Sequence, residues 1–289
     1  MAQLHKSTIQ LLRFHFSFFL LPVYLFAISQ AGVLIVGRAL MVFAILHFLV
    51  YPASNGYNSY MDRDTDPIGG VKNPMQPTRE LFIVSLLMDI FAVILSFLMD
   101  PVFGIGVVLY IAVSRAYSYR GIRLKKYPIL GYLTVTVFQG AMMYVFISKT
   151  CDASVSTLRL NLPAVISSML IGGFYPLTQI YQHDSDLKDG VKTLSYILGY
   201  RGTFIFSGIV YSFAMALLFY YFQEIGQPLK FAMFMVFMLP VPIYFLKWAI
   251  AVWKNNAAAD YTHTMKINLI ASLCTNIAFI SLLIWKIYE

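Results

Sequence analysis

Residues 49–66, LVYPASNGYNSYMDRDTD, run from the end of an apolar segment directly into a cluster of carboxylates. A second stretch, residues 174–190, FYPLTQIYQHDSDLKDG, does the same later in the chain. Together the two stretches hold six of the thirteen acidic residues. Charged groups are costly close to a membrane, so an ionisable cluster beside apolar segments indicates a functional site. We interpret the pair as one divalent-cation site assembled from two parts of the protein.

The composition outside these stretches is that of a membrane protein. The 289 residues are 59% hydrophobic and 12% charged, with a mean hydropathy of +0.71. A soluble domain carries about 25% charged residues. The apolar residues fall in runs of roughly 20, long enough to cross about 30 Å of hydrocarbon. The sequence therefore predicts an all-α, polytopic membrane protein with about nine transmembrane helices in a bundle. We expect these spans at 14–30, 32–51, 81–99, 102–118, 128–148, 161–181, 202–222, 230–252 and 267–286.

The net charge of +8 follows the expected membrane topology and does not imply a nucleic-acid partner. If successive loops alternate between the two sides, sixteen of the 21 lysines and arginines fall on one side. Basic residues gather on the cytoplasmic side of membrane proteins. We therefore expect a protein of the prokaryotic inner (plasma) membrane. The N-terminus and both acidic stretches would be cytoplasmic, and the C-terminus would lie outside.

A short internal sequence repeat suggests that the single domain, residues 1–289, contains two pseudo-repeated halves, roughly 14–150 and 160–289. Each acidic stretch contains Tyr-Pro near its start and an aspartate, Asp62 or Asp186, eleven residues after that tyrosine. In each stretch, residues with side-chain amides also stand at the same offsets between the tyrosine and the aspartate. The aligned positions are Tyr51, Pro52, Asn55, Tyr57, Asn58 and Asp62 in the first half and Tyr175, Pro176, Gln179, Tyr181, Gln182 and Asp186 in the second. The alternative is that two unrelated helix ends share a Tyr-Pro kink.

The spacing of the first acidic stretch suggests metal binding. Asn58, Asp62 and Asp66 are separated by four residues, so on a continued helix they would form a ladder of oxygen ligands on one face, with Asp64 pointing elsewhere. Hard cations such as Mg²⁺ take oxygen ligands together with water or substrate phosphate oxygens. One such element in each half could clamp a diphosphate between metal ions. The alternative is solvated charge at a membrane border.

Other recognisable motifs are missing from the sequence. Asp62, Asp64 and Asp66 have the opening spacing of an EF-hand, but Pro67 stands where that loop needs glycine, and Asn73 stands where it needs glutamate. Neither His183 nor His263 has zinc spacing, and no Walker loop, Rossmann fingerprint or Ser-His-Asp arrangement is visible. Nucleotide chemistry is therefore not expected.

The densest basic stretch, residues 117–126, YSYRGIRLKK, could neutralise a diphosphate, and so could Lys192 after the second acidic stretch. For both, the alternative is orientation by cytoplasmic positive charge.

These residues together resemble the UbiA superfamily of intramembrane prenyltransferases over nearly the whole chain. Asn58, Asp62 and Asp66 match the family's N-x-x-x-D-x-x-x-D element after the second helix. Asp186, followed by Gly190 and Thr193, matches the end of its second acidic element, and Asp184 matches an acidic position that is frequent there. Tyr117-Ser118 with Arg123-Leu124-Lys125 is similar to the family's YS…RLK loop.

The resemblance implies Mg²⁺-dependent transfer of an isoprenyl group from a prenyl diphosphate to a lipophilic acceptor within the bilayer. An aromatic or quinone-precursor acceptor is the expected class, with tetrapyrrole, lipid and sugar-phosphate acceptors left open. Asp62, Asp66 and Asp186 would be the catalytic metal-binding residues, and Asp184 would support the metal. The diphosphate would be held by Asn58, Lys72, Tyr117, Arg123, Lys125 and Lys192.

Several positions depart from the family pattern, which marks the chain as a divergent member. Gln182 stands where an aspartate is usual in the second element, and Ser59 where an aspartate is frequent in the first. Arg120-Gly121 replaces a common Pro-Pro, and Lys72 stands near a missing Arg-Pro.

A non-catalytic membrane protein of the same fold, which binds or transports a cation or an isoprenoid, is the alternative. A transporter should carry ionisable groups near the middle of its helices, where Asp89 and Arg38 are the main candidates. The acids gather instead at the helix ends, and this distribution favours the enzyme.

Overall fold

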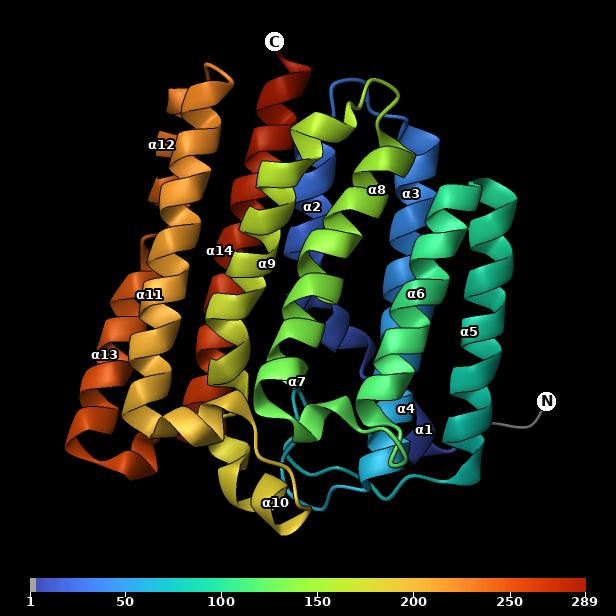
Figure 1. The fold of residues 1–289 in the computed structure, drawn as a ribbon, viewed down its shortest axis with the longest axis vertical. Coiled ribbons are helices and arrows are strands. Elements are labelled where there is room, and N and C mark those ends of the chain that lie inside the picture. The colour runs from blue at the N-terminus through green and yellow to red at the C-terminus, as the bar shows by residue number, and fades with distance from the viewer. Residues whose placement is uncertain (1–3) are drawn as a thin grey trace.

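The computed structural model describes residues 4–289 as a bundle of long helices running side by side, and none of this part of the chain forms a sheet (Figure 1). The first half contains α1 (Lys6–Leu12), α2 (Leu21–Ser29), α3 (Val36–Ile45), α4 (Tyr51–Asp62), α5 (Arg79–Met99), α6 (Pro101–Ser118), α7 (Pro128–Val135) and α8 (Met143–Cys151). The second half contains α9 (Asn161–Thr178), α10 (His183–Lys188), α11 (Leu194–Glu224), α12 (Pro228–Met238), α13 (Pro240–Lys254) and α14 (Tyr261–Ile287). The expected all-α fold is confirmed.

Shorter helical turns join several of these helices. The 3₁₀ turns are η1 (Phe14–Phe19), η3 (Leu124–Lys126), η5 (Thr157–Leu160), η6 (Ile180–Gln182) and η7 (Asn256–Ala258), and π-helical turns are η2 (Leu46–Val50) and η4 (Thr136–Met142). Prolines stand in the first turn of α6, α7 and α12, where the missing N–H costs nothing.

Consecutive helices join into spans of membrane length. Within residues 4–289, seven helical segments are long and apolar enough to cross a membrane, and α12 with α13 forms an eighth that is bent by 41°. The remaining expected span, 161–181, corresponds to α9, which packs in the bundle against α11 and η4. Glycines, serines and prolines interrupt its apolar residues, and it is not among those seven segments. The expected number of about nine therefore holds when α9 is included.

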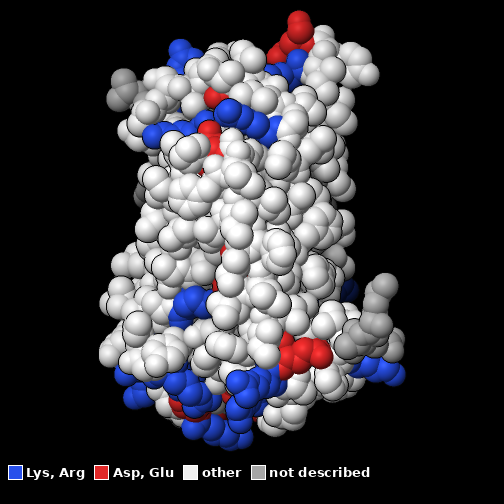
Figure 2. Space-filling model, turned by 90° about the vertical axis from the view of Figure 1, so that its right-hand side faces the viewer, with Lys and Arg blue, Asp and Glu red and all other residues white. Residues whose placement is uncertain are grey.

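The outer faces of the helices are apolar, and the charges gather at the two ends of the bundle. Figure 2 shows an uncharged band around the middle, with lysine and arginine crowded at the lower end. The described N-terminal part lies toward that end and the C-terminus lies at the other (Figure 1). An odd number of crossings produces this arrangement.

Aromatic packing joins the first and last spans in the core of the bundle. The ring of Phe26 on α2 stacks on Phe279 of α14 with centroids 4.8 Å apart, and Phe279 also contacts Phe234 of α12. All three side chains are fully buried. Contacts between elements that are more than 200 residues apart therefore bring the two halves into one core.

The predicted helical ladder in the first acidic stretch is wrong. Helix α4 ends at Asp62, and Arg63 adopts a left-handed conformation with φ of 54° while its N–H donates to the Ser59 carbonyl. Asp66 therefore lies in the following loop. Proline at position 67 disfavours helical geometry at Asp66, so the helix could not continue through it.

Candidate active site

A cavity of about 330 Å³ lies between helices of both halves. Its lining comes from the α1–α2 segment, α4, α6, the α7–η4 segment, α9, α10, α11 and α14, with residues of the connecting loops. One part of the lining is charged, namely Arg13, Asp62, Asp64, Lys125 and Asp186. The remainder is apolar or carries uncharged hydroxyl and amide groups. Asp62 and Asp186, which are 124 residues apart in sequence, therefore face a single cavity.

Asp62 is the most heavily contacted carboxylate in the cavity. The Lys125 ammonium lies 2.5 Å from Asp62 Oδ2, and the Asn58 side-chain amide donates to the same oxygen over 3.0 Å. The Arg123 guanidinium lies 3.8 Å from Asp62 Oδ1, which is buried and has no hydrogen-bond partner. This oxygen is available to a ligand. Asn58 also donates to the Ser118 hydroxyl over 2.9 Å, which holds its amide in place.

The carboxylates of Asp64 and Asp186 are much less compensated. Burial, with a smaller contribution from the neighbouring carboxylates of Asp64 and Asp62, raises the pKa of Asp186 to about 7 against the opposing effect of Lys125. Burial and the charge of Asp62 raise the pKa of Asp64 to about 6. Both groups therefore hold protons more tightly than a solvated aspartate. A cation placed among these carboxylates would relieve their mutual repulsion.

The donor set fits Mg²⁺ that is shared with a phosphate ligand. Within the described part of the chain, no three His, Cys, Asp or Glu side chains lie close enough together to enclose a metal ion. Mg²⁺ seldom needs such a cage, because it is usually held by one or two carboxylates and completed by water and phosphate oxygens. The buried, unpartnered Asp62 Oδ1 and the facing Asp186 carboxylate offer such ligands from two sides.

The cavity brings together only part of the residue set predicted from sequence. Asn58, Asp62, Tyr117, Lys125 and Asp186 line it, and Arg123 reaches it through its contact with Asp62. The other four predicted residues are exposed and do not line it, namely Asp66, Lys72, Asp184 and Lys192. Asp64, which we expected to point elsewhere on the helix, lines the cavity because the chain leaves the helix at Arg63.

The basic loop after α6 connects the two acidic stretches. Arg123 is buried, and its guanidinium pairs with the Asp189 carboxylate and donates to the Asp189 carbonyl over 2.9 Å. Arg120 donates to the Met61 carbonyl over 2.8 Å and lies 3.5 Å from Asp189. Cations from one loop thus hold the end of α4 beside the segment after α10. This arrangement gives the basic stretch a specific place at the site beyond orienting the protein in the membrane.

Arg13 is a cavity residue that the sequence analysis counted only as part of the basic side. Its side chain is 6% exposed, it forms no ion pair within residues 4–289, and it donates to the carbonyls of Gly69 and Asn55 over 3.1 and 3.3 Å. Its Nε has no partner, and its backbone is left-handed with φ of 47°. Arg13 directly precedes the expected span 14–30, and no local signal in the sequence distinguishes it from the other basic residues of that side. Arg13 places a second cation in the cavity besides Lys125.

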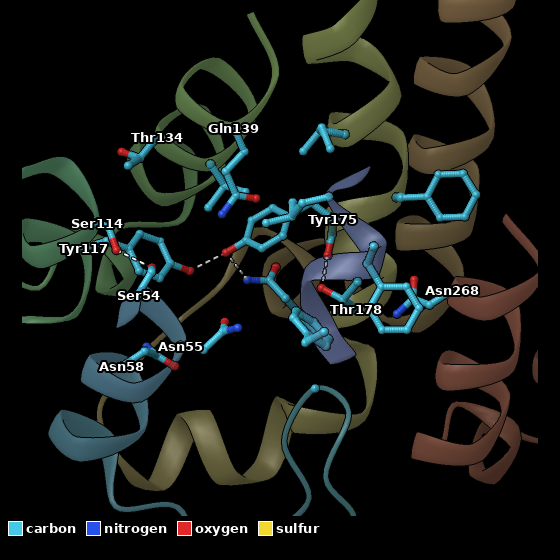
Figure 3. A pocket seen from close by; sticks show the side chains of 18 of the residues that line it. Ser54, Asn55, Asn58, Ser114, Tyr117, Thr134, Gln139, Tyr175, Thr178 and Asn268 are labelled. Atoms are coloured by element: carbon cyan, nitrogen blue, oxygen red, sulfur yellow. Dashed lines mark hydrogen bonds between the residues drawn. The ribbon is translucent and has the colours of Figure 1, made fainter. Parts of the chain in front are cut away.

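A hydrogen-bond network joins the two halves deeper in the cavity (Figure 3). The hydroxyls of Tyr117 on α6 and Tyr175 on α9 contact each other, and the Gln179 amide donates to Tyr175 over 2.9 Å. Ser54 on α4 and Ser114 on α6 share a 2.5 Å contact in the same region. The sequence analysis named Tyr175 and Gln179 only as positions of the internal sequence repeat and assigned them no role.

Comparisons with known proteins agree with this geometry. Residues 19–270 match the UbiA prenyltransferase family. No curated protein sequence matches the chain significantly. Three solved structures share the fold. An apo UbiA homologue from Aeropyrum pernix K1 has a TM-score of 0.69 at 17% identity over 92% of this chain and 97% of that chain. A UbiA homologue from Archaeoglobus fulgidus bound to GPP and Mg²⁺ scores 0.66 at 16% identity, covering 96% and 99%. A digeranylgeranylglyceryl phosphate synthase scores 0.58 at 18% identity, covering 96% and 97%.

Proposed function

The chain belongs to the UbiA prenyltransferase family, and we propose that it transfers an isoprenyl group from a prenyl diphosphate to an aromatic or quinone-precursor acceptor with the help of Mg²⁺. One observation carries the proposal. A single cavity joins Asp62 and Asp186 from the two acidic stretches, adds Lys125, and continues into an uncharged interior. Such a cavity suits a substrate with an anionic head and an apolar tail.

The charged part of the cavity would hold the diphosphate and its metal. Asp62 and Asp186 would offer carboxylate oxygens to Mg²⁺, and Asp64 lines the same charged part of the cavity. Lys125, Arg123 and Arg13 would bind the diphosphate oxygens. Exposed Asp66 and Asp184 would support the metal, and exposed Lys72 and Lys192 the diphosphate, only if their loops fold over the bound donor. Structures of a UbiA homologue from Archaeoglobus fulgidus, one with GPP and Mg²⁺ bound and one with DMAPP and Mg²⁺ bound, support this assignment.

The reaction would proceed by breaking the allylic C–O bond of the donor. The bonding electron pair leaves with pyrophosphate, the prenyl carbon forms a bond to the acceptor, and the acceptor loses a proton. Bound Mg²⁺ would supply neutralisation of the charge that develops on the leaving group. Lys125, Arg123 and Arg13 would stabilise the same charge through fixed positions in a site that excludes water.

The uncharged part of the cavity would protect the reactive prenyl cation. The aromatic side chains of Phe16, Phe19, Phe26, Phe138 and Phe174 line it, and their π faces can stabilise a nearby positive charge. Exclusion of water prevents hydrolysis of the intermediate. The charged end, where lysine and arginine are crowded (Figure 2), would face the cytoplasm of a prokaryotic inner membrane.

Pyrophosphate release by purified protein in detergent tests the proposal. Geranyl and farnesyl diphosphate would be supplied with a pool of aromatic acceptors, in Mg²⁺ or in EDTA. We expect Mg²⁺-dependent release by the wild type and its loss in Asp62→Asn. Glu224→Gln, an exposed change at the opposite end of the bundle, is the matched control and should retain activity.

The alternative function, a non-catalytic membrane protein that binds or transports a cation or an isoprenoid, predicts a different result. Such a protein would bind geranyl diphosphate with Mg²⁺ and release no pyrophosphate with any acceptor. The buried Asp89–Arg115 ion pair within the spans is the feature closest to a transporter's ionisable groups, yet it does not line the cavity. Release by the wild type that persists in Asp62→Asn would also overturn the proposal.

A further inference from the structure

A second hollow lies on the outside of the bundle, in a groove between α11 and α13. The two helices pack side by side at the edge of the bundle (Figure 1). The groove measures about 520 Å³ and is lined by α11 between Phe204 and Phe213 and by α13 between Phe245 and Trp253. None of its lining residues lines the catalytic cavity. The groove is therefore a separate surface, which faces outward from the bundle.

Small residues open this groove. A Cβ added to Gly208 would first meet the Phe245 ring at 3.7 Å, which is an ordinary contact distance, so space remains beside the glycine. Ser212 lies one turn farther along α11, and Ala249 lines the facing helix. Buried Phe204, which packs against Phe245 with ring centroids 5.5 Å apart, forms the floor. The result is an apolar channel that suits an alkyl chain.

The length of the groove matches one leaflet of a bilayer. Along α11, the nine residues from Phe204 to Phe213 rise about 14 Å. The hydrocarbon core of a bilayer is about 30 Å thick, so the groove covers about half of it. Trp253 is the last residue but one of α13, so the groove begins at a helix end and stops near the middle of the membrane. A lipid acyl chain has this reach, whereas a partner's transmembrane helix would need a face that crosses both leaflets.

Cations stand where the groove reaches the end of the helices. The break at Gly199, whose φ is 67°, starts the long part of α11 and places Arg201 in its first turn. The Arg201 guanidinium lies 6.0 Å from the Trp253 ring centroid and donates to the Trp253 carbonyl over 3.0 Å. Lys254 follows Trp253 as the last residue of α13, and both basic side chains are exposed. An arginine has five N–H groups, so most of those on Arg201 are available to an anion.

An anionic phospholipid complements both parts of this surface. Its acyl chain would bury apolar surface in the groove, and its phosphate oxygens would accept from Arg201 in the bidentate geometry that guanidinium groups favour. A net negative headgroup adds attraction to Lys254, since basic residues near a membrane surface attract anionic lipids. Trp253 lies between the two parts, and tryptophan is enriched at the level of lipid headgroups.

We propose that the groove between α11 and α13 binds an anionic phospholipid, with one acyl chain against Gly208 and the phosphate between Arg201 and Lys254. The lipid would come from the leaflet at the end of the bundle where the two cations lie. The groove shares no lining residue with the catalytic cavity, so the site is independent of prenyl transfer and its test needs no prenyl diphosphate.

Lipid titration followed by native mass spectrometry tests the site. The full-length protein, delipidated in detergent, would receive palmitoyl-oleoyl phosphatidylglycerol or the phosphatidylcholine with the same chains. We expect the wild type to bind the first phosphatidylglycerol about tenfold more tightly, because two basic residues act on its negative headgroup. In Arg201→Gln combined with Lys254→Gln this ratio should fall to about one. Arg79→Gln combined with Lys6→Gln, which removes two exposed cations at the same end of the bundle, should keep the wild-type ratio.

A variant that fills the groove tests the acyl-chain part. Gly208→Leu places a side chain where the alkyl chain would lie, and it should weaken phosphatidylglycerol binding by about tenfold. Gly37 on α3 is exposed and has nothing within 4 Å of an added Cβ, so Gly37→Leu is the matched control and should bind as the wild type does. Leucine is a better helix former than glycine, so both helices should tolerate the change.

Three results on lipid binding would overturn the site. They are equal binding of the two lipids by the wild type, a preference that survives loss of Arg201 and Lys254, and unchanged phosphatidylglycerol binding in Gly208→Leu. The wild-type comparison needs no variant, so it decides even if a variant does not fold. A wild-type dimer that becomes a monomer in Gly208→Leu would also overturn the lipid site, because the groove would then hold a second copy of this chain.

Discussion

The first acidic stretch places Asp62 in the cavity and the second places Asp186 there, but the surroundings of the two carboxylates differ. Asp62 ends a continuous helix and is paired with Lys125 at 2.5 Å, with Asn58 and Arg123 close by. Asp186 lies on a separate short helix and forms no ion pair in the described chain. Burial and its acidic neighbours instead raise its pKa to about 7. Cations neutralise the Asp62 carboxylate, whereas the Asp186 carboxylate can be neutralised by a proton or a metal ion.

The difference follows from local backbone structure. In the first half, α4 continues unbroken to Asp62 and stops only at the left-handed Arg63. In the second, α9 ends at Thr178 two residues after Pro176, and a 3₁₀ turn intervenes before α10 carries Asp186. Equal sequence offsets therefore reach the cavity by different paths. The basic loop after α6 then contacts Asp62 directly, while Asp186 receives only its longer-range charge.

The largest expected effect on activity comes from removing the Asp186 carboxylate, which no cation pairs with in the described part of the chain. Asp186→Asn should lower kcat/KM for the prenyl diphosphate by about 10³-fold or more, because a metal ligand and its electrostatic stabilisation of the leaving group disappear together. Steady-state pyrophosphate release at saturating Mg²⁺ measures this, with Glu224→Gln as the control. Activity within tenfold of the wild type would mean that the second stretch does not hold the metal.

Replacing Lys125, which pairs with Asp62, should weaken binding of the prenyl diphosphate and strengthen binding of Mg²⁺. In Lys125→Gln, donor KM should rise about tenfold because a diphosphate contact is lost. Affinity for Mg²⁺ without donor should increase, because the ammonium no longer competes for Asp62 Oδ2. Titration calorimetry and donor KM are the two measurements, with exposed Lys126→Gln as the matched control. If both affinities fall, Lys125 serves only to hold the loop in place.

The two other aspartates of the first stretch should differ, because one lines the cavity and the other is exposed. Asp64→Asn should raise the Mg²⁺ concentration for half-maximal activity by about tenfold, whereas Asp66→Asn should change it less than about threefold. Activity measured across a Mg²⁺ series compares the variants directly. The reverse order would show that the loop after α4 folds over the bound donor and brings Asp66 to the metal.

The smallest effect concerns pH and stability. The pKa values of Asp186 and Asp64, about 7 and about 6, exceed the ordinary value of about 3.9, so the folded protein binds their protons more tightly than the unfolded chain. The stabilisation of the folded state by these two bound protons is present at low pH and is lost as the pH rises through the folded-state pKa values of about 6 and about 7. In EDTA, Tm should therefore fall by a few degrees between pH 5 and pH 8.

The control for this pH effect is the metal itself. Saturating Mg²⁺ should reduce the fall in Tm, since the cation replaces the protons, and Asp186→Asn should reduce it without metal. A Tm in EDTA that rises over the same range in the wild type relative to Asp186→Asn would contradict the assignment of an unbalanced carboxylate.

The amount of the site that could be predicted from sequence depended on how regular the local backbone is. Asp62 and Asn58 lie on a continuous helix, where spacing translates directly into a shared face, and both line the cavity. Asp66 was placed on the same face only by extending the helix past Arg63. That error arose because the helix stop is a left-handed arginine, and no glycine marks it. The two pseudo-repeated halves stay a prediction that rests on the aligned offsets.

Long-range contacts were outside the reach of the sequence. The sequence does not indicate that Lys125 pairs with Asp62 or that Arg123 pairs with Asp189, because the partners are 60 or more residues apart. It also does not indicate that Arg13 points into the cavity, because Arg13 is held there by backbone carbonyls. Tyr175 and Gln179 were visible only as repeat members. Their role depends on Tyr117, which comes from the other half.

The sequence by itself determined the all-α class and the membrane environment, because apolar runs of fixed length have few other physical explanations. It also predicts the chemical kind of site, because carboxylates seldom cluster beside membrane spans without a function. The tertiary structure decided which charges are paired, which aspartates enter the cavity and where a groove opens on the outside of the bundle. Those outcomes depend on how helices from distant parts of the chain pack, and a difference of one helical turn at a single terminus is enough to change them.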